Sequence, residues 1–128
     1  MKIGTHGSTF AGSPMAMSLA NAVLDIMLKP GFEEHISEVS KYFFDKLNEI
    51  KNKFPKIVKE IRGKGLMIGL HFFEDPSEFL TEFLKNKLIT VKASDNVIRI
   101  FPPLNVKKEE IVEGINIINK SFQEHNSK

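Results

Sequence analysis

The stretch from residue 32 to residue 54 constrains the fold of this chain more than any other. Its apolar residues recur at steps of three and four, with lysines between them, which is the spacing of one face of a helix. A helix of that length with a single apolar face must cover another apolar surface. The residues of the face are Phe32, Ile36, Val39, Phe43, Leu47, Ile50 and Phe54.

Two short runs after this helix predict a pair of strands. Residues 57–61 and 66–73 mix branched and aromatic side chains on either side of the bend Arg62-Gly63-Lys64-Gly65. Branched and aromatic residues favour strands, and a glycine-rich bend favours a turn between them. The spacing of this bend is not that of a nucleotide-binding loop, so a connection between strands is its best interpretation.

The last third of the chain predicts a helix, two more strands and a final helix. Residues 76–87 carry apolar side chains at helical spacing, and residues 89–91 and 97–100 form short strands around the turn Ser94-Asp95-Asn96. Asn105 is expected to cap the final helix. The apolar face of that helix is Ile111, Ile115, Ile118 and Phe122.

The predicted order of elements is therefore α-α-β-β-α-β-β-α. This order is typical of an α+β domain in which helices cover a short, largely antiparallel sheet. A chain of 128 residues is long enough to bury a core of that kind.

The segment from Pro14 to Leu28 predicts a helix with almost no polar face. Ser13 is in a good capping position, proline is well suited to the first turn, and Lys29-Pro30-Gly31 ends the helix. Asn21 and Asp25 interrupt the apolar surface of this helix. A membrane span needs about 20 apolar residues, so we do not interpret the helix as one. We expect this helix to be covered on most sides.

Composition excludes several classes of protein. The chain has no cysteine, which rules out disulfides and thiolate metal sites, and we expect a cytoplasmic location. Its net charge of +2 is spread along the chain, so we expect neither nucleic acid nor a membrane as partner. The four histidines are not at metal-ligand spacing, and no metal site is predicted.

The segment from Gly4 to Pro14 is the first candidate binding site. It gathers glycines and hydroxyls immediately before a predicted helix, where free backbone N–H groups favour an anion such as phosphate or carboxylate. The alternative is a flexible loop with an ordinary helix cap.

Arg99 is the second candidate. It is one of only two arginines, against 16 lysines, and lies in the apolar run Val97-Ile98-Arg99-Ile100. A guanidinium among apolar neighbours needs an anionic partner. A structural salt bridge and a substrate carboxylate both meet that need, and the salt bridge is the commoner of the two.

Three motifs in order resemble the class III aminotransferases that depend on pyridoxal 5′-phosphate (PLP), particularly their acetylornithine and succinylornithine branch. The first is the loop Gly4-Thr5-His6-Gly7-Ser8-Thr9-Phe10, and the second is residues 61–70, Ile-Arg-Gly-Lys-Gly-Leu-Met-Ile-Gly-Leu. The third is residues 97–106 with Glu109-Glu110-Ile111 after them. The resemblance spans almost the whole chain.

The resemblance implies roles for three residues. Thr9 would bind the phosphate of PLP held by a partner subunit, with Ser8 beside it toward the substrate. Arg99 would face the active site and pair with a substrate carboxylate or with an acidic residue of the large domain. It also implies a cofactor-phosphate and interface loop at 1–13, an interdomain helix at 14–30, and the small C-terminal domain of a fold-type I PLP enzyme at 31–128.

The family's PLP-binding lysine lies upstream of the first loop, and none of the lysines here stands in the matching context. We therefore expect no catalytic residue in this chain and a C-terminal fragment that is inactive alone. The parent reaction would be amino transfer between N-acetylornithine and 2-oxoglutarate in arginine biosynthesis, with a fragment of an ornithine or 4-aminobutyrate aminotransferase as the alternative.

Two interpretations of the chain that involve no catalysis are also open. One is a non-catalytic interaction domain that self-associates through the loop and the first helix, and the other is a stand-alone phosphate- or PLP-binding module built on Ser8 and Thr9. Whether the chain is an enzyme fragment or an interaction domain, we expect it to form a homo-oligomer, because large apolar surfaces are rarely left exposed. A separate chain carrying the large PLP domain is a further possible partner.

Overall fold

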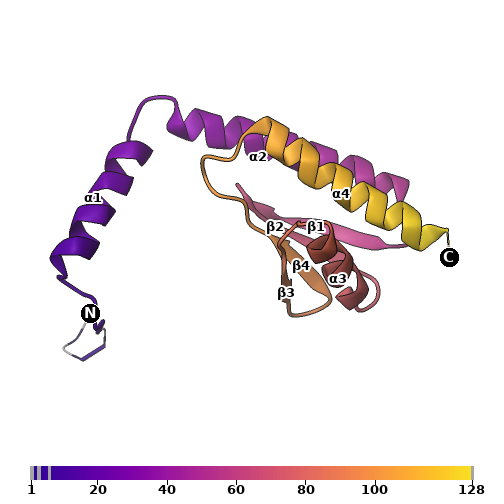
Figure 1. Cartoon of the computed structure of the whole chain (residues 1–128), viewed down its shortest axis with the longest axis horizontal. Coiled ribbons are helices and arrows are strands. Elements are labelled where there is room, and N and C mark those ends of the chain that lie inside the picture. The colour runs from indigo at the N-terminus through magenta and orange to yellow at the C-terminus, as the bar shows by residue number, and fades with distance from the viewer. Residues whose placement is uncertain (1, 3, 6, 128) are drawn as a thin grey trace. The chain divides into compact units, whose positions relative to one another are not determined.

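The computed structural model describes residues 2, 4, 5 and 7–127, and the chain divides into two compact units, residues 1–35 and 36–128. The elements follow the predicted order and confirm the α+β class (Figure 1). In the described residues they are α1 (Pro14–Met27), α2 (Phe32–Lys53), β1 (Val58–Lys64), β2 (Met67–Phe72), α3 (Ser77–Lys85), β3 (Val91–Ala93), β4 (Val97–Ile100) and α4 (Lys108–Asn126).

Helix α1 begins and ends close to where the sequence predicts. Pro14 occupies its first turn, and Pro30 follows its end because proline cannot continue a helix. The expectation that Ser13 caps the helix is half right, since Ser13 is at the cap position but its hydroxyl makes no capping hydrogen bond. No residue of α1 is buried within the chain, so the surface expected to cover this helix is not supplied by the described residues.

The four strands form one antiparallel sheet in the order β1-β2-β4-β3. Strand β1 continues through the predicted bend as far as Lys64, which pairs with Met67, so the turn is the two residues Gly65 and Leu66. Strand β3 begins two residues later than predicted, at Val91, which pairs with Arg99.

Residues with a positive φ occur in both hairpins, in the turn between β3 and β4 and within strand β1. Asp95 and Asn96 have φ of 60° and 56° in the turn between β3 and β4, a region that these two residue types enter more readily than most. Gly63 has φ of 152°, and a Cβ added there would lie 2.1 Å from the carbonyl oxygen of Met67. Only glycine lets the two strands approach so closely at this point.

Three helices cover one face of the sheet (Figure 1). The core between them is a single apolar cluster built from α2, α4, α3 and the inward side chains of the strands, among them Ile68, Leu70 and Ile98. Helices α2 and α4 also touch outside the core, where Lys53 donates to Asn119 at 3.1 Å and Lys108 stands over the ring of Tyr42. No helix in the described residues is long and apolar enough to cross a membrane.

Asp75 ties the start of α3 to the edge strand β3. Its carboxylate accepts the backbone N–H of Ser77 at 2.9 Å and also the Ser77 hydroxyl, and Lys92 of β3 donates to it at 2.8 Å. The Lys92 hydrogen bond, helped by the two from Ser77, lowers the pKa of the Asp75 carboxyl from its ordinary 3.8 to about 2. An acidic cap of this kind satisfies the free N–H groups of a helix start.

The start of α4 corrects one prediction. Asn105 lies in a turn and does not cap the helix; the cap position is Lys107. The carboxylate of Glu110 reaches back and accepts the backbone N–H of Lys107 at 2.7 Å. This is the glutamate half of a capping box, and it explains why a lysine is acceptable where a hydroxyl residue is common.

Two glycine-to-alanine substitutions should change stability in opposite directions. Gly63→Ala should lower the free energy of unfolding by more than about 1 kcal/mol, because the new Cβ collides with the backbone of Met67. Gly114→Ala should raise it by about 0.5–1 kcal/mol, because Gly114 lies inside α4 and its new Cβ would only touch Leu88 at 3.6 Å. Urea denaturation measures both, and equal effects would contradict the close approach at Gly63.

Asp75→Asn should remove a pH dependence of stability between about pH 4 and pH 2. Because the pKa of Asp75 is lowered in the folded state, its contribution is present above the unfolded value and is lost as the pH falls through about 2. The difference in free energy of unfolding between wild type and variant should therefore shrink across this range. Ser77→Ala, which removes one donor to Asp75, should move the loss to higher pH; a difference that does not change with pH would contradict the assignment.

Candidate functional site

The first candidate site is the loop that carries Ser8 and Thr9. The Ser8 hydroxyl accepts the backbone N–H of Phe10 at 3.3 Å, and the Ser8 carbonyl accepts that of Ala11 at 3.3 Å. These bonds hold residues 8–11 in a turn that places the exposed Thr9 side chain next to Ser8. The Thr9 hydroxyl makes no hydrogen bond to the described residues, so it can donate to a ligand.

The beginning of α1 provides further donors beside this loop. Another turn, in which Ser13 N–H bonds to the Phe10 carbonyl at 3.2 Å, leads into the helix, and Ser13 leaves its first N–H groups uncapped by a side chain. Uncapped N–H groups at the positive end of a helix favour an anion. The exposed hydroxyl of Thr9 and the uncapped helix start are therefore chemically suited to the phosphate of PLP.

Arg99 lies on the opposite face of the sheet from its apolar neighbours in the sequence. The flanking Ile98 and Ile100 point into the core, whereas Arg99 points to the opposite, uncovered face of the sheet and is exposed. Its guanidinium forms no ion pair or hydrogen bond with the described residues. The structural salt bridge expected as the commoner outcome is thus not present there, and the guanidinium is available to an anion.

The structure also adds residues that the sequence reasoning treated only as part of a bend. Arg62 of β1 pairs with Gly69 of β2, and Gly69 pairs with Arg99 of β4, so the two arginines lie on the same face. Two residues along each strand, on the same face, Glu60 pairs with His71, and the carboxylate and the imidazole Nδ1 are 3.8 Å apart. Strand alternation alone could have put Arg62 and Arg99 on one face only if the register had been known.

The three predicted site residues fall in both units of the chain. Ser8 and Thr9 are neighbours in the first unit, and Arg99 belongs to the second. His6, which belongs to the first loop motif, lies outside the described residues. Among those described, no three histidine, aspartate or glutamate side chains gather in a way that could hold a metal ion.

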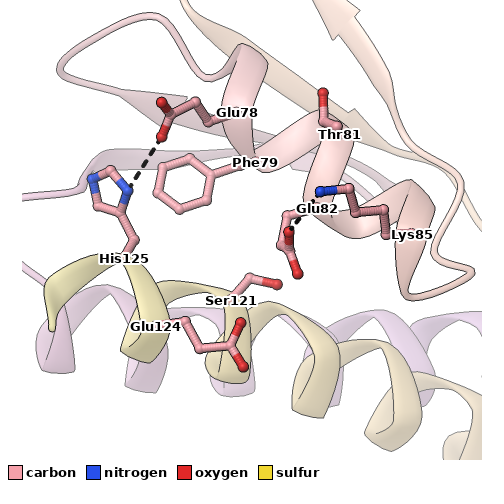
Figure 2. A pocket seen from close by; sticks show the side chains of 8 residues that line it. All are labelled: Glu78, Phe79, Thr81, Glu82, Lys85, Ser121, Glu124 and His125. Atoms are coloured by element: carbon pink, nitrogen blue, oxygen red, sulfur yellow. Dashed lines mark ion pairs between the residues drawn. The ribbon is translucent and has the colours of Figure 1, made fainter. Parts of the chain in front are cut away.

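A cleft of about 290 Å³ between α3 and α4 is a separate feature of the second unit (Figure 2). Glu78 of α3 pairs with His125 of α4 at 3.6 Å, and the ring of Phe79 lies 4.8 Å from the imidazole. Glu82 pairs with Lys85 at 3.8 Å within α3. The contact between Glu78 and His125 joins α3 to α4 at the rim of the core, and no sequence motif predicted it.

The fold and the loop together belong to a known class of enzyme. Residues 1–122 match the model of the class III aminotransferases. The chain belongs to this family.

Relatives and solved structures agree on the class. The chain is 41% identical over 118 residues to acetylornithine aminotransferase 1 of Bradyrhizobium diazoefficiens, covering 92% of this chain and 29% of that protein. It is 39% identical over 121 residues to the acetylornithine aminotransferase of Clostridium acetobutylicum, covering 94% and 31%. The chain thus spans about three-tenths of the length of these relatives.

Solved aminotransferases share the fold. The acetylornithine aminotransferase of Elizabethkingia anophelis matches 97% of this chain and 32% of its own, with a TM-score of 0.83 and 28% identity. The ornithine aminotransferase of Toxoplasma gondii matches 99% of this chain and 31% of its own, with a TM-score of 0.84 and 28% identity. The predicted small domain of a PLP aminotransferase is thereby confirmed.

Proposed function

We propose that this chain supplies the small domain and the phosphate-contacting loop of an acetylornithine aminotransferase, which transfers an amino group between N-acetylornithine and 2-oxoglutarate in arginine biosynthesis. The observation that carries the proposal is the identity of 41% to a relative of that name across 92% of the chain. An ornithine aminotransferase is the alternative, favoured by the match to the Toxoplasma gondii structure, although at the lower identity of 28%.

In this proposal the loop of the first unit holds the cofactor. The Thr9 hydroxyl donates a hydrogen bond to the PLP phosphate, and the uncapped start of α1 adds the attraction of its positive end. Ser8 already accepts the N–H of Phe10 and so keeps the turn in shape beside the substrate. When bound, PLP supplies an electron sink for the carbon that exchanges its proton.

Arg99 binds the substrate in this proposal. Its planar guanidinium can hold a carboxylate through two parallel hydrogen bonds, and the rigid strand β4 fixes the position from which it does so. A lysine at the same place would offer a point charge without the fork. Because no lysine of this chain stands in the family's context for holding PLP, we propose that the amine comes from the large domain of the complete enzyme.

Substitutions at Thr9 and Arg99 should separate cofactor binding from substrate binding. In a chimera where this chain replaces the matching segment of the Clostridium acetobutylicum relative, Thr9→Val should weaken PLP retention about tenfold, the loss of one charge-assisted hydrogen bond. Arg99→Lys should raise the KM for 2-oxoglutarate at least about tenfold while PLP absorbance stays the same.

Thr5→Val is the matched control, because its hydroxyl donates to the Lys2 carbonyl of the same loop at 2.7 Å. It should leave PLP retention and KM unchanged. A chimera that accepts ornithine in preference to N-acetylornithine would favour the alternative substrate. A chimera that folds, retains PLP and transfers no amino group from either would refute the proposed activity.

The apolar surface of α1 should make the chain associate when it is alone. Its large side chains are exposed, among them Leu19, Val23 and Ile26, each of which is more than half exposed. Light scattering should therefore give a mass above the 14.5 kDa of one chain, and Val23→Lys should lower that mass. Asn21→Lys adds the same charge at a polar position and should have less effect; a monomeric wild type with α1 helical would contradict the prediction.

A further inference from the structure

The cleft of about 290 Å³ between α3 and α4 lies on the helical side of the sheet, opposite the face that carries Arg99 (Figure 2). We propose that this cleft binds a small organic cation with a primary ammonium group and a short hydrocarbon chain. The carboxylates of Glu82 and Glu124 and the hydroxyl of Ser121 take the ammonium group, and the ring of Phe79 takes the hydrocarbon. The residues proposed for amino transfer have no part in this site, so the inference goes beyond the proposed function.

Ser121 of α4 gives the cleft a buried hydrogen-bond acceptor. It lines the cleft and is the only polar residue among the described ones that is buried, with 3% of its surface exposed. Its hydroxyl donates its hydrogen to the carbonyl of Ile117 at 3.0 Å, one turn earlier in α4. The hydrogen is therefore committed, and the oxygen keeps a lone pair without a partner among the described residues. A buried acceptor of this kind is satisfied by a donor on a ligand.

Three glutamates line the cleft, and their ionic partners do not come within hydrogen-bond distance. The pairs are Glu78 with His125 at 3.6 Å, Glu82 with Lys85 at 3.8 Å, and Glu124 with Lys120 at 3.8 Å. The ion pair of Asp75 with Lys92 in the same unit measures 2.8 Å. One oxygen of Glu82 accepts the side-chain amide of Asn86 at 3.0 Å, which leaves its second oxygen without a hydrogen bond to the described residues. These carboxylates can therefore accept further donors.

The balance of charge in the cleft favours a cation. Its lining has three carboxylates, those of Glu78, Glu82 and Glu124, against the basic side chains of Lys85 and His125. The lining is therefore negative whether or not the imidazole is protonated. A partly enclosed hollow that carries one sign of charge concentrates ions of the opposite sign.

The shape and chemistry of the cleft favour an ammonium group joined to a hydrocarbon chain. Figure 2 shows the hydroxyl of Ser121 and the carboxylates of Glu82 and Glu124 pointing into the same part of the cleft. An ammonium group has three N–H donors and no acceptor, which suits a set of acceptors. The ring of Phe79 lies nearer the other end and offers an apolar surface. A cleft of about 290 Å³ has the volume of roughly ten water molecules, so the ligand is small.

Titration of the 128-residue chain followed by amide NMR tests the site. The probes are butylammonium, ammonium, butan-1-ol and butyrate at fixed pH and ionic strength. We expect butylammonium to shift the amide signals of Phe79, Glu82 and Ser121 and to bind about tenfold more tightly than the other three probes, because it alone combines the positive charge with the hydrocarbon. Equal affinity for all four probes, or butylammonium shifts that lie mainly outside the cleft, would overturn the proposal.

Variants show which groups hold the cation. Glu82→Gln and Glu124→Gln should each weaken butylammonium binding about tenfold, the loss of one charge-assisted hydrogen bond, and Ser121→Ala should weaken it about threefold. Lys85→Gln should strengthen binding, because it removes a positive charge from the lining. Glu113→Gln is the matched control, because Glu113 is an exposed glutamate of α4 that does not line the cleft. It should change binding less than twofold.

The control distinguishes a site from a general effect of charge. An equal loss in Glu113→Gln and Glu82→Gln would mean that the negative charge of the whole surface is responsible, and the site would be refuted. Arg99→Gln should leave butylammonium binding unchanged, because Arg99 lies on the opposite face of the sheet. A chain that does not bind butylammonium refutes the site and leaves the proposed amino transfer standing. Amide spectra that are unchanged outside the cleft show that each variant is folded.

Discussion

The packing of Phe122 is the contact on which the second unit depends. This fully buried ring of α4 makes edge or tilted contacts with Phe54 at the end of α2, Phe72 of β2, and Phe79 and Phe83 of α3, with ring centres 4.8–6.2 Å apart. Aromatic pairs at these distances add to the stability gained from burial alone. One residue thus joins all three helices to the same face of the sheet.

This one-sided packing gives the two faces of the sheet different roles. Every helix of the second unit that contacts the core lies on the Phe122 side, so the other face keeps exposed side chains such as Arg62, Met67 and Arg99. An antiparallel sheet can leave one face in contact with water, and charged side chains are at home there. A guanidinium on such a face is accessible, while the strand beneath it packs on the core.

The sequence predicted the helices better than the ends of strands. Helical periods over many residues identified α2 and α4, because an apolar face repeats several times. Helix α1 was identified from its proline start and its Lys29-Pro30-Gly31 end. Strands of three to seven residues offer no such repetition, and the turn at Gly65 and Leu66 was placed too early. The pairing of Arg62 with Gly69 was not predicted, because it follows from the position of the turn: Lys64 pairs with Met67 across Gly65 and Leu66, and Arg62 then pairs with Gly69. Asn105 is not the cap because the carboxylate of Glu110, three residues after Lys107, accepts the Lys107 N–H and so places the start of α4.

The two units differ in how much of their apolar surface is buried and how many of their polar groups are paired within the unit. The second has a closed apolar core, and its polar groups at the helix ends are capped by Asp75 and Glu110. The first is a helix with no buried residue and a loop whose Thr9 hydroxyl has no partner in the described chain. Exposed apolar helices gain stability only by burial against another surface. It follows that the second unit buries its own apolar surface, whereas α1 gains nothing from burial within the chain. On the proposed function, cofactor binding and association would both supply the surface that the loop and α1 lack.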